Sequence, residues 1–137
     1  MYLQIADRYI DPQTLLSAKR TIISIGRHTD EAYNTIALND PQADIFQCQI
    51  KHTADGWILN NGQWRTECPK GIRSRLQHAC NMCTGRCVNT HTANPHYSWR
   101  IPLIPTLING HTIQPDGQPL IDGDSILCGQ TIINVRG

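Results

Sequence analysis

Three short apolar runs lie within residues 21–51, TIISIGRHTDEAYNTIALNDPQADIFQCQIK. The first run, Thr21–Ile25, is rich in β-branched residues, and the second is Thr35–Leu38. Both compositions are typical of strands. The third run, Phe46–Lys51, alternates apolar with polar side chains, as a half-buried strand does. Because the turn signal Asn39-Asp40-Pro41 separates the second run from the third, the stretch predicts three short strands joined by loops.

The same pattern of short strands and turns continues on both sides of this stretch. Asp55-Gly56 is a hairpin signal before a further apolar run, and Asn109-Gly110 is another turn signal. The other expected strands are Tyr2–Ile5, Gly56–Leu59, Leu107–Ile108, His111–Ile113, Ser125–Cys128 and Thr131–Val135. Many short strands joined by turn residues indicate a β-sandwich or a β-barrel.

The composition limits the function classes. The chain has 137 residues, which is enough for one hydrophobic core. Its formal net charge is +1, so the chain lacks the basic excess that nucleic-acid binding usually needs. No apolar run approaches the roughly 18 residues that a membrane span requires, and Met1–Arg8 lacks the basic-then-apolar order of a secretory signal. We therefore expect a cytoplasmic chain that binds neither nucleic acid nor membrane.

Three segments carry a more specific pattern. The first is Ile25-Gly26-Arg27 followed by Asn34–Asp40, which contains an asparagine, an aliphatic residue, a leucine and an aspartate in that order. The second is the expected strand Gln47–Ile50 with its hairpin. The third is Asn109-Gly110 followed by Leu120–Gly129, which contains a leucine, Gly-Asp, an aliphatic residue and a glycine. In their order and spacing these segments resemble the forkhead-associated (FHA) family.

The resemblance implies an all-β fold, an FHA-like β-sandwich of two twisted, mostly antiparallel sheets. It covers about residues 20–66 and 105–136, so we expect a single domain over 1–137 with an irregular cysteine-rich insertion at about 67–104. It also implies a signalling or scaffold module whose loops recognise phosphothreonine in a protein partner. Such a pocket needs an arginine and hydroxyl or amide donors, because a phosphate carries about two negative charges and three acceptor oxygens.

The resemblance marks three candidate residues for the phosphopeptide site, Arg27, Asp44 and Asn61, and a bracing position at Gln47. Arg27 matches the family's phosphate-binding arginine, although it can also brace neighbouring loops. Asp44 and Gln47 stand where the family has a phosphate-binding serine and, three residues later, a histidine that braces the loop. A carboxylate repels phosphate, so the sequence predicts that phosphothreonine binding is weakened or lost. Asp44 either caps a turn or pairs with Arg27, and Asn61 is the nearest counterpart of the family's site asparagine.

The insertion contains four cysteines within a short stretch, Cys68, Cys80, Cys83 and Cys87. Four thiolates complete a tetrahedral zinc shell, and metal ligation supplies the folding energy that a segment poor in apolar residues lacks. We therefore expect a structural zinc ion. Disulfides, free thiols and an iron–sulfur cluster are the alternatives, and His78 or His91 can replace one cysteine ligand. The remaining cysteines, Cys48 and Cys128, lie on expected strands and are interpreted as core residues.

The sequence shows no nucleophile elbow and no glycine-rich phosphate loop, so we expect no enzyme. Three hypotheses remain. The chain is a protein-interaction module of the FHA kind, or a metal-dependent adaptor whose insertion is itself the binding surface. The third hypothesis is a thiol-redox protein that uses the Cys80-Asn81-Met82-Cys83 motif, which lacks the βαβ context usual for such motifs.

Overall fold

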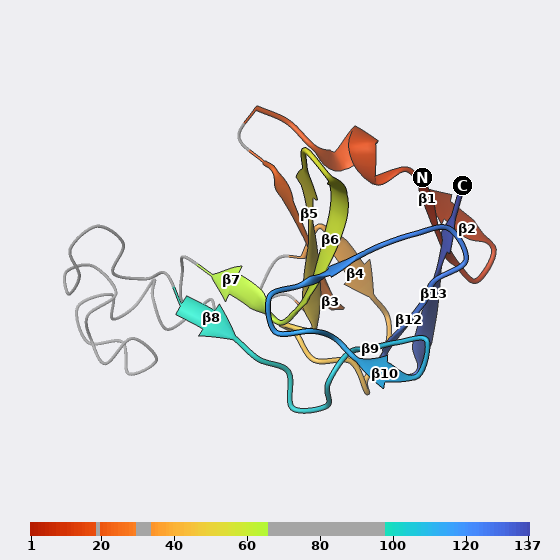
Figure 1. The fold of residues 1–137 in the computed structure, drawn as a ribbon. Helices are drawn as coiled ribbons and strands as arrows, with labels where there is room; N and C mark the ends of the chain where they lie inside the picture. The colour runs from red at the N-terminus through yellow and green to blue at the C-terminus, as the bar shows by residue number, and fades with distance from the viewer. Residues whose placement is uncertain (19, 30–33, 66–97) are drawn as a thin grey trace.

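The computed structural model describes residues 1–18, 20–29, 34–65 and 98–137, and within them the chain forms a sandwich of two sheets with a short two-stranded hairpin beside it (Figure 1). The only helical element in these ranges is a 3-10 turn, η1 (Pro12–Leu15). Its start follows from Asp11, whose carboxylate accepts a hydrogen bond from the backbone N–H of Gln13.

One sheet of the sandwich has six strands. These are β1 (Tyr2–Ile5), β2 (Arg8–Ile10), β9 (Leu107–Ile108), β10 (His111–Thr112), β12 (Ser125–Cys128) and β13 (Thr131–Arg136). Their order is β10-β9-β12-β13-β1-β2, and every pair is antiparallel. Because β1 pairs with β13, with Leu3 opposite Val135, the two ends of the chain lie side by side.

The other sheet has five strands. These are β3 (Ile22–Arg27), β4 (Ile36–Leu38), β5 (Cys48–Thr53), β6 (Gly56–Asn61) and β11 (Gln118–Pro119), in the order β11-β6-β5-β3-β4. The β3–β4 pair is parallel, with Gly26 opposite Ala37, and the other three pairs are antiparallel. The predicted class, an all-β sandwich of two mostly antiparallel sheets, is therefore confirmed.

A hairpin of β7 (Gln63–Arg65) and β8 (Ser98–Arg100) projects from the sandwich, with Gln63 opposite Arg100 (Figure 1). Most of the expected insertion, about 67–104, comes between these two strands. Cys68, Cys80, Cys83, Cys87 and the rest of 66–97 lie outside the described residues. Residues 98–104, at the end of the expected insertion, form β8 and a segment that is hydrogen-bonded to the sandwich.

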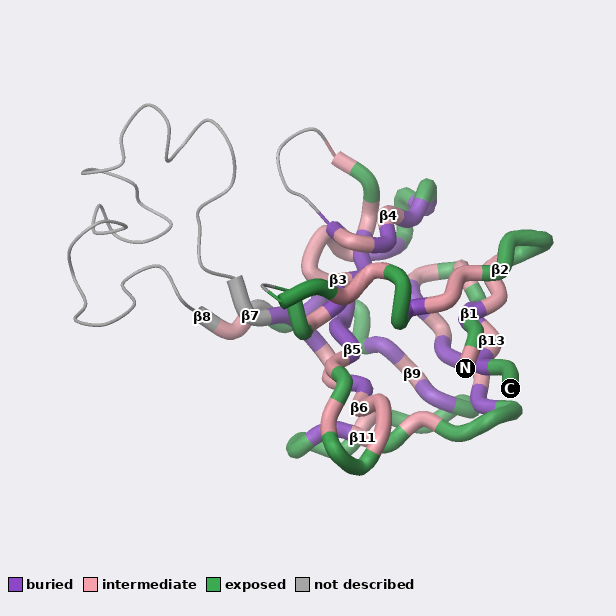
Figure 2. The backbone as a smooth tube through the Cα atoms, turned by 90° about the horizontal axis from the view of Figure 1, so that it is seen from above, coloured by how far each residue is buried: buried purple, intermediate pink, exposed green. Residues whose placement is uncertain are grey.

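The hydrophobic core lies between the two sheets, where the alternating strand residues point inward, and Figure 2 shows buried positions gathering there. The largest fully buried apolar side chains are Leu3, Ile23, Ile25, Ile50, Leu59, Ile108, Ile126, Ile133 and Val135. Cys48 on β5 and Cys128 on β12 are also fully buried in this core, as the sequence predicted.

Candidate phosphopeptide site and the pocket around Arg27

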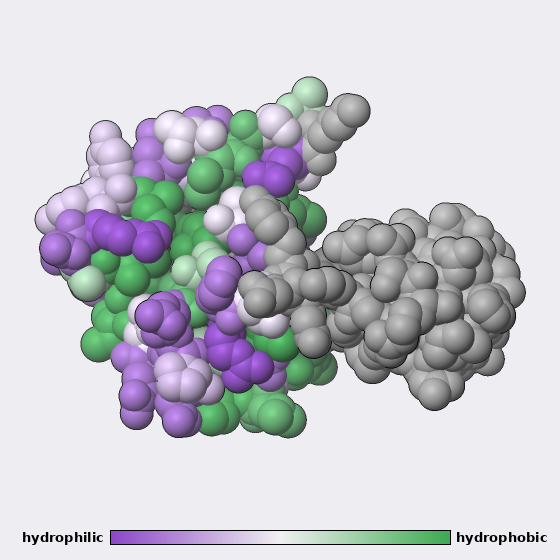
Figure 3. Space-filling model, turned by 180° about the vertical axis from the view of Figure 1, so that it is seen from behind, coloured by the Kyte–Doolittle hydropathy of each residue, from purple (hydrophilic) through white to green (hydrophobic). Residues whose placement is uncertain are grey.

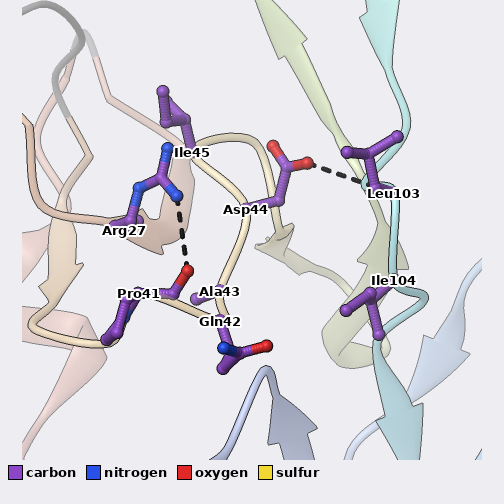
Figure 4. Close-up of a pocket in the computed structure, with 8 residues that line it drawn as sticks. All are labelled: Arg27, Pro41, Gln42, Ala43, Asp44, Ile45, Leu103 and Ile104. Carbon is purple, nitrogen blue, oxygen red and sulfur yellow. Dashed lines mark hydrogen bonds between the residues drawn. The ribbon is translucent and has the colours of Figure 1, made fainter.

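A pocket of about 380 Å³ opens at one end of the sandwich. It is lined by Arg27, Pro41, Gln42, Ala43, Asp44, Ile45, Leu103 and Ile104. Figure 4 shows Arg27 on one side, Leu103 and Ile104 on the other, and the loop of residues 41–45 between them. The pocket therefore brings together two of the three predicted site residues, Arg27 and Asp44.

Arg27 reaches the pocket because β3 ends at this loop. Its backbone N–H donates a hydrogen bond of 2.9 Å to the carbonyl of Asp44, and its Nη1 lies 3.5 Å from the carbonyl oxygen of Pro41. The contact with Pro41 is long and weak, so most of the guanidinium's donors have no acceptor among the described residues. The arginine is half-buried, which holds the charged group in place at the pocket wall.

Gly26 explains why a glycine precedes this arginine. A Cβ atom at Gly26 would lie 2.1 Å from the carbonyl oxygen of Ile45 and 2.8 Å from Nδ2 of Asn34. These two groups also bond each other, because Asn34 Nδ2 donates to the Ile45 carbonyl at 2.9 Å. The missing side chain therefore allows the loop to pass directly over β3, and this close approach forms the pocket.

Asp44 caps a turn, which was one of the two interpretations left open by the sequence. Its Oδ1 accepts a hydrogen bond of 2.9 Å from the N–H of Phe46, and its Oδ2 accepts one of 3.1 Å from the N–H of Leu103. The alternative, an ion pair with Arg27, is wrong: both residues are described, and the structure forms no ion pair between them. The carboxylate points across the loop to Leu103 and away from the guanidinium (Figure 4).

Gln47 braces the loop from the position at which the resemblance implies a histidine. Its side chain is fully buried, and its Oε1 accepts a hydrogen bond of 2.8 Å from the N–H of Asp44. Its Nε2 donates to the carbonyl of Ile104 at 3.0 Å and to the hydroxyl of Thr106 at 2.8 Å. One amide therefore links the loop at 44 to the segment at 104–106, and these are the two walls of the pocket.

Asn61, the third predicted site residue, does not line the pocket. It lies at the end of β6, where its Oδ1 accepts a hydrogen bond of 3.0 Å from the N–H of Thr106. Together with Gln47 it fixes the segment that carries Leu103 and Ile104. In this structure Asn61 thus supports one wall of the pocket from behind.

Asp40 ties the pocket loop to the turn between β12 and β13. Its Oδ2 accepts hydrogen bonds from the hydroxyl of Thr131 at 2.6 Å and the N–H of Gln130 at 2.9 Å, and its Oδ1 accepts one from the N–H of Gln42 at 2.8 Å. Burial raises the pKa of Asp40, but the bonds from Thr131 and from nearby backbone N–H groups outweigh burial and lower the pKa below its ordinary value. The ionised aspartate is therefore part of the folded loop.

Gln63 is a second buried glutamine that sequence reasoning missed. It is fully buried, and its Nε2 faces the carbonyls of Ile25 and Cys48 and the Oδ1 of Asn34 at 2.8 to 3.0 Å. Its Oε1 has no hydrogen-bond partner among the described residues. The amide joins β3, β5 and the start of β4, so it holds in place the strand end that carries Arg27.

Three exposed aliphatic side chains form a rim beside the pocket. Ile101, Leu103 and Ile104 are 68%, 92% and 52% exposed, and they belong to the segment that Asp44, Gln47 and Asn61 hold. From behind, Figure 3 shows hydrophobic and hydrophilic residues interspersed over the sandwich. Leu103 and Ile104 line the pocket opposite Arg27, and this combination of exposed aliphatic side chains with one arginine suits contact with an extended peptide.

The described ranges lack two other features. They contain no group of three or more His, Cys, Asp or Glu side chains placed to hold a metal ion. Nor do they contain a helix long and apolar enough to cross a bilayer.

Comparison with known proteins identifies the fold. No family model matches the chain, and no curated protein matches it. Among solved structures it is similar to the FHA domain of FhaA, whose crystal structure is a complex with the intracellular domain of Rv3910. The chain has the fold of an FHA domain. The likeness covers 98% of each chain with a TM-score of 0.51, and at 18% sequence identity it establishes the FHA fold, as predicted from the sequence.

Proposed function

We propose that this FHA-like domain is a non-enzymatic protein-interaction module that binds an extended segment of a partner protein at the Arg27 pocket. One observation carries the proposal: Arg27 lies across the pocket from the exposed side chains of Leu103 and Ile104. Most of the donors of Arg27 have no acceptor among the described residues, so they can bind a ligand. The similar FHA domain of FhaA was crystallised with a protein partner, which supports the same class of function.

The chemistry of the pocket favours a weak contribution from phosphate. Arg27 is the one cation among the eight described lining residues. The backbone N–H groups of Gln42, Asp44 and Phe46 already donate to side chains of the protein, so they are not available to a phosphate. A phosphate about 5 Å from the Asp44 carboxylate, at an effective dielectric of about 20, would meet a repulsion of about 3 kcal/mol per charge. This is similar in size to the gain from Arg27, so the two effects nearly cancel.

The ligand that fits is therefore a peptide with an aliphatic side chain against Leu103 and Ile104 and an acidic group beside Arg27. A carboxylate carries less charge than a phosphate and meets less repulsion from Asp44. We infer that a peptide with phosphothreonine facing Arg27 and Asp44 binds only slightly more tightly than the same peptide with unmodified threonine. Asn61 acts in this proposal by holding the rim.

The test is a screen of peptide arrays in which each threonine-containing peptide is present with threonine, phosphothreonine or glutamate. We expect hits with an aliphatic and an acidic residue and a phosphorylation effect below about threefold. Arg27→Ala and Leu103→Ala should each weaken binding of the best hit about tenfold or more. The matched controls, Arg8→Ala and Ile132→Ala, change an exposed arginine and an exposed isoleucine on the six-stranded sheet and should leave affinity unchanged.

Two results would contradict the proposal. A hundredfold preference for phosphothreonine would show that the pocket is a functional phosphate site despite Asp44. Absence of any hit that depends on Arg27 or Leu103 would remove the pocket from the binding surface.

We also propose that Cys68, Cys80, Cys83 and Cys87 hold a structural zinc ion in the insertion. The support is the sequence: four thiol ligands occur within a short stretch, and Arg65, Lys70, Arg73, Arg75 and Arg86 offset the net negative charge of a zinc tetrathiolate. The thiolates must stay reduced, so this proposal requires a reducing compartment such as the cytoplasm. Elemental analysis of the purified protein should find about one equivalent of zinc.

Less than about half an equivalent would contradict the zinc site, and stoichiometric iron with sulfide would replace it by an iron–sulfur cluster. The Cys80-x-x-Cys83 motif supports a rival, the thiol-redox protein. That rival requires Cys80 and Cys83 to react rapidly with a thiol-trapping reagent, whereas zinc-bound thiolates are protected from it.

A further inference from the structure

Two cysteines from opposite sheets meet in the centre of the sandwich. Cys48 lies on β5 of the five-stranded sheet and Cys128 on β12 of the six-stranded sheet. Their Sγ atoms are 3.7 Å apart, and both side chains are fully buried. Neither the FHA-like interaction surface nor the expected zinc site uses either thiol.

The strand geometry directs both side chains to the same place. On β5, Cys48 and Ile50 share the inward face, and on β12, Ile126 and Cys128 do the same. Each sulfur therefore points from its own sheet toward the other. The sulfurs are 3.7 Å apart and must approach by about 1.7 Å to reach the disulfide length of about 2.05 Å.

We propose that Cys48 and Cys128 form a cross-sheet disulfide when the chain folds in contact with an oxidised low-molecular-weight disulfide, and remain a dithiol when it folds under reducing conditions. In the reaction, the Cys48 thiolate attacks the small disulfide, forms a mixed disulfide and releases one small thiol. The Cys128 thiolate then attacks the Cys48 sulfur and displaces the second small thiol. The protein loses two electrons and two protons, and the small disulfide gains them.

The folded dithiol is protected from this reaction. The hydrogen bond with Cys48, burial, and the nearby charges of Cys48 and Asp40 together raise the pKa of the Cys128 thiol well above its ordinary value. A thiol that stays protonated is a poor nucleophile, and a fully buried one is out of reach of an oxidant. The cross-link therefore has to form before the two sheets close, or after they open.

The consequence is a large, redox-dependent difference in stability. The two cysteines are 80 residues apart, so a cross-link between them restricts a long loop of the unfolded chain. The chain-entropy estimate for a loop of this length is a change of about a thousandfold in the folding equilibrium, which corresponds to a rise in Tm of about 15 °C for a chain of 137 residues.

The test compares full-length protein refolded from denaturant with oxidised or with reduced glutathione. After alkylation and proteolysis under non-reducing conditions, the oxidised sample should yield a peptide pair joined through Cys48 and Cys128, two hydrogen atoms lighter than the separate peptides. Recovery of both cysteines as alkylated thiols from the oxidised sample would overturn the proposal. This mapping uses the unaltered chain, so it does not depend on a variant that folds.

Thermal unfolding provides the second readout. The oxidised protein should melt about 15 °C above the reduced protein. The control variant Cys128→Ala retains Cys48 and all four cysteines of the insertion, so it would still show any Tm difference that those residues cause. We expect the oxidised and reduced forms of this variant to have the same Tm. A shift of equal size in Cys128→Ala would assign the effect to other cysteines. Folded protein should react with oxidised glutathione at these two sites far more slowly than refolding protein, and equal rates would contradict the burial argument.

Discussion

Replacing Gln47 by alanine tests the claim that one buried amide holds the two walls of the pocket together. The variant removes three hydrogen bonds, to the N–H of Asp44, the carbonyl of Ile104 and the hydroxyl of Thr106. The three groups that lose a hydrogen bond differ in how much free energy their loss costs. Water can reach the carbonyl of the exposed Ile104, and the Thr106 hydroxyl still donates to the Gln47 carbonyl at 3.0 Å.

The main cost is the Asp44 N–H left without its acceptor, at about 1–3 kcal/mol. Loss of a buried methylene group adds about 0.8 kcal/mol. We therefore expect Gln47→Ala to lower the free energy of unfolding by about 2–4 kcal/mol. Urea unfolding measures this directly, and for a slope of about 2 kcal/mol/M the midpoint falls by about 1–2 M.

Two further variants sharpen this experiment. Gln130→Ala removes an exposed glutamine side chain from the β12–β13 turn and should change the stability by less than about 0.5 kcal/mol. Gln47→His introduces a side chain with one donor and one acceptor, so it should lose less stability than alanine. If Gln47→Ala and Gln130→Ala unfold at the same urea concentration, the amide is not a brace and the reasoning is refuted.

The remaining predictions concern the loop that forms the pocket. The lowered pKa of Asp40 means that its carboxylate stabilises the fold above the ordinary aspartate pKa of about 3.9, and that this contribution is lost as the pH falls through the folded value. The stability gap between wild type and Asp40→Asn, measured by urea unfolding, should therefore shrink from pH 5 toward pH 2, and Asp116→Asn, in an exposed turn, is the matched control. Gly26→Ala forces a Cβ against the Ile45 carbonyl and should cost about 3 kcal/mol in the same assay. Gly56→Ala has open space around it, so only its positive φ of 111° counts, and a cost of about 1 kcal/mol is expected; equal costs for the two glycines would refute the steric argument.

Much of the fold was predictable because it depends on local patterns. The runs at Thr21–Ile25 and Thr131–Val135 have the β-branched composition of strands, and the structure places β3 and β13 there. The turn signals at Asp55-Gly56 and Asn109-Gly110 also mark observed turns, with φ of 111° at Gly56 and 52° at Asn109. Strands β2 and β11 were missed because they are short and form only where a neighbouring strand offers pairing partners.

The site was less predictable because its important contacts join distant parts of the chain. Gln47 meets Thr106 across 59 residues, and Gln63 meets Ile25 across 38. Nothing in a single glutamine marks it as buried, since the residue is usually exposed. Arg27 and Asp44 were found because a family resemblance marked their positions, but only the structure separates the turn cap formed by Asp44 from an ion pair.

The pairing of β1 with β13 has a consequence for how this domain can be combined with other proteins. The loop at Asp40 contacts the start of β13, at Thr131, whereas Met1 lies beside Gly137 just beyond the strand's other end (Figure 1). A strand of this length spans about 20 Å, so the chain ends and the pocket are at opposite poles of the sandwich. A protein fused at either end would thus leave the pocket unobstructed, and both connections would emerge at a single point. The domain can therefore be inserted as a unit into a loop of a host protein, with the Arg27 pocket facing outward.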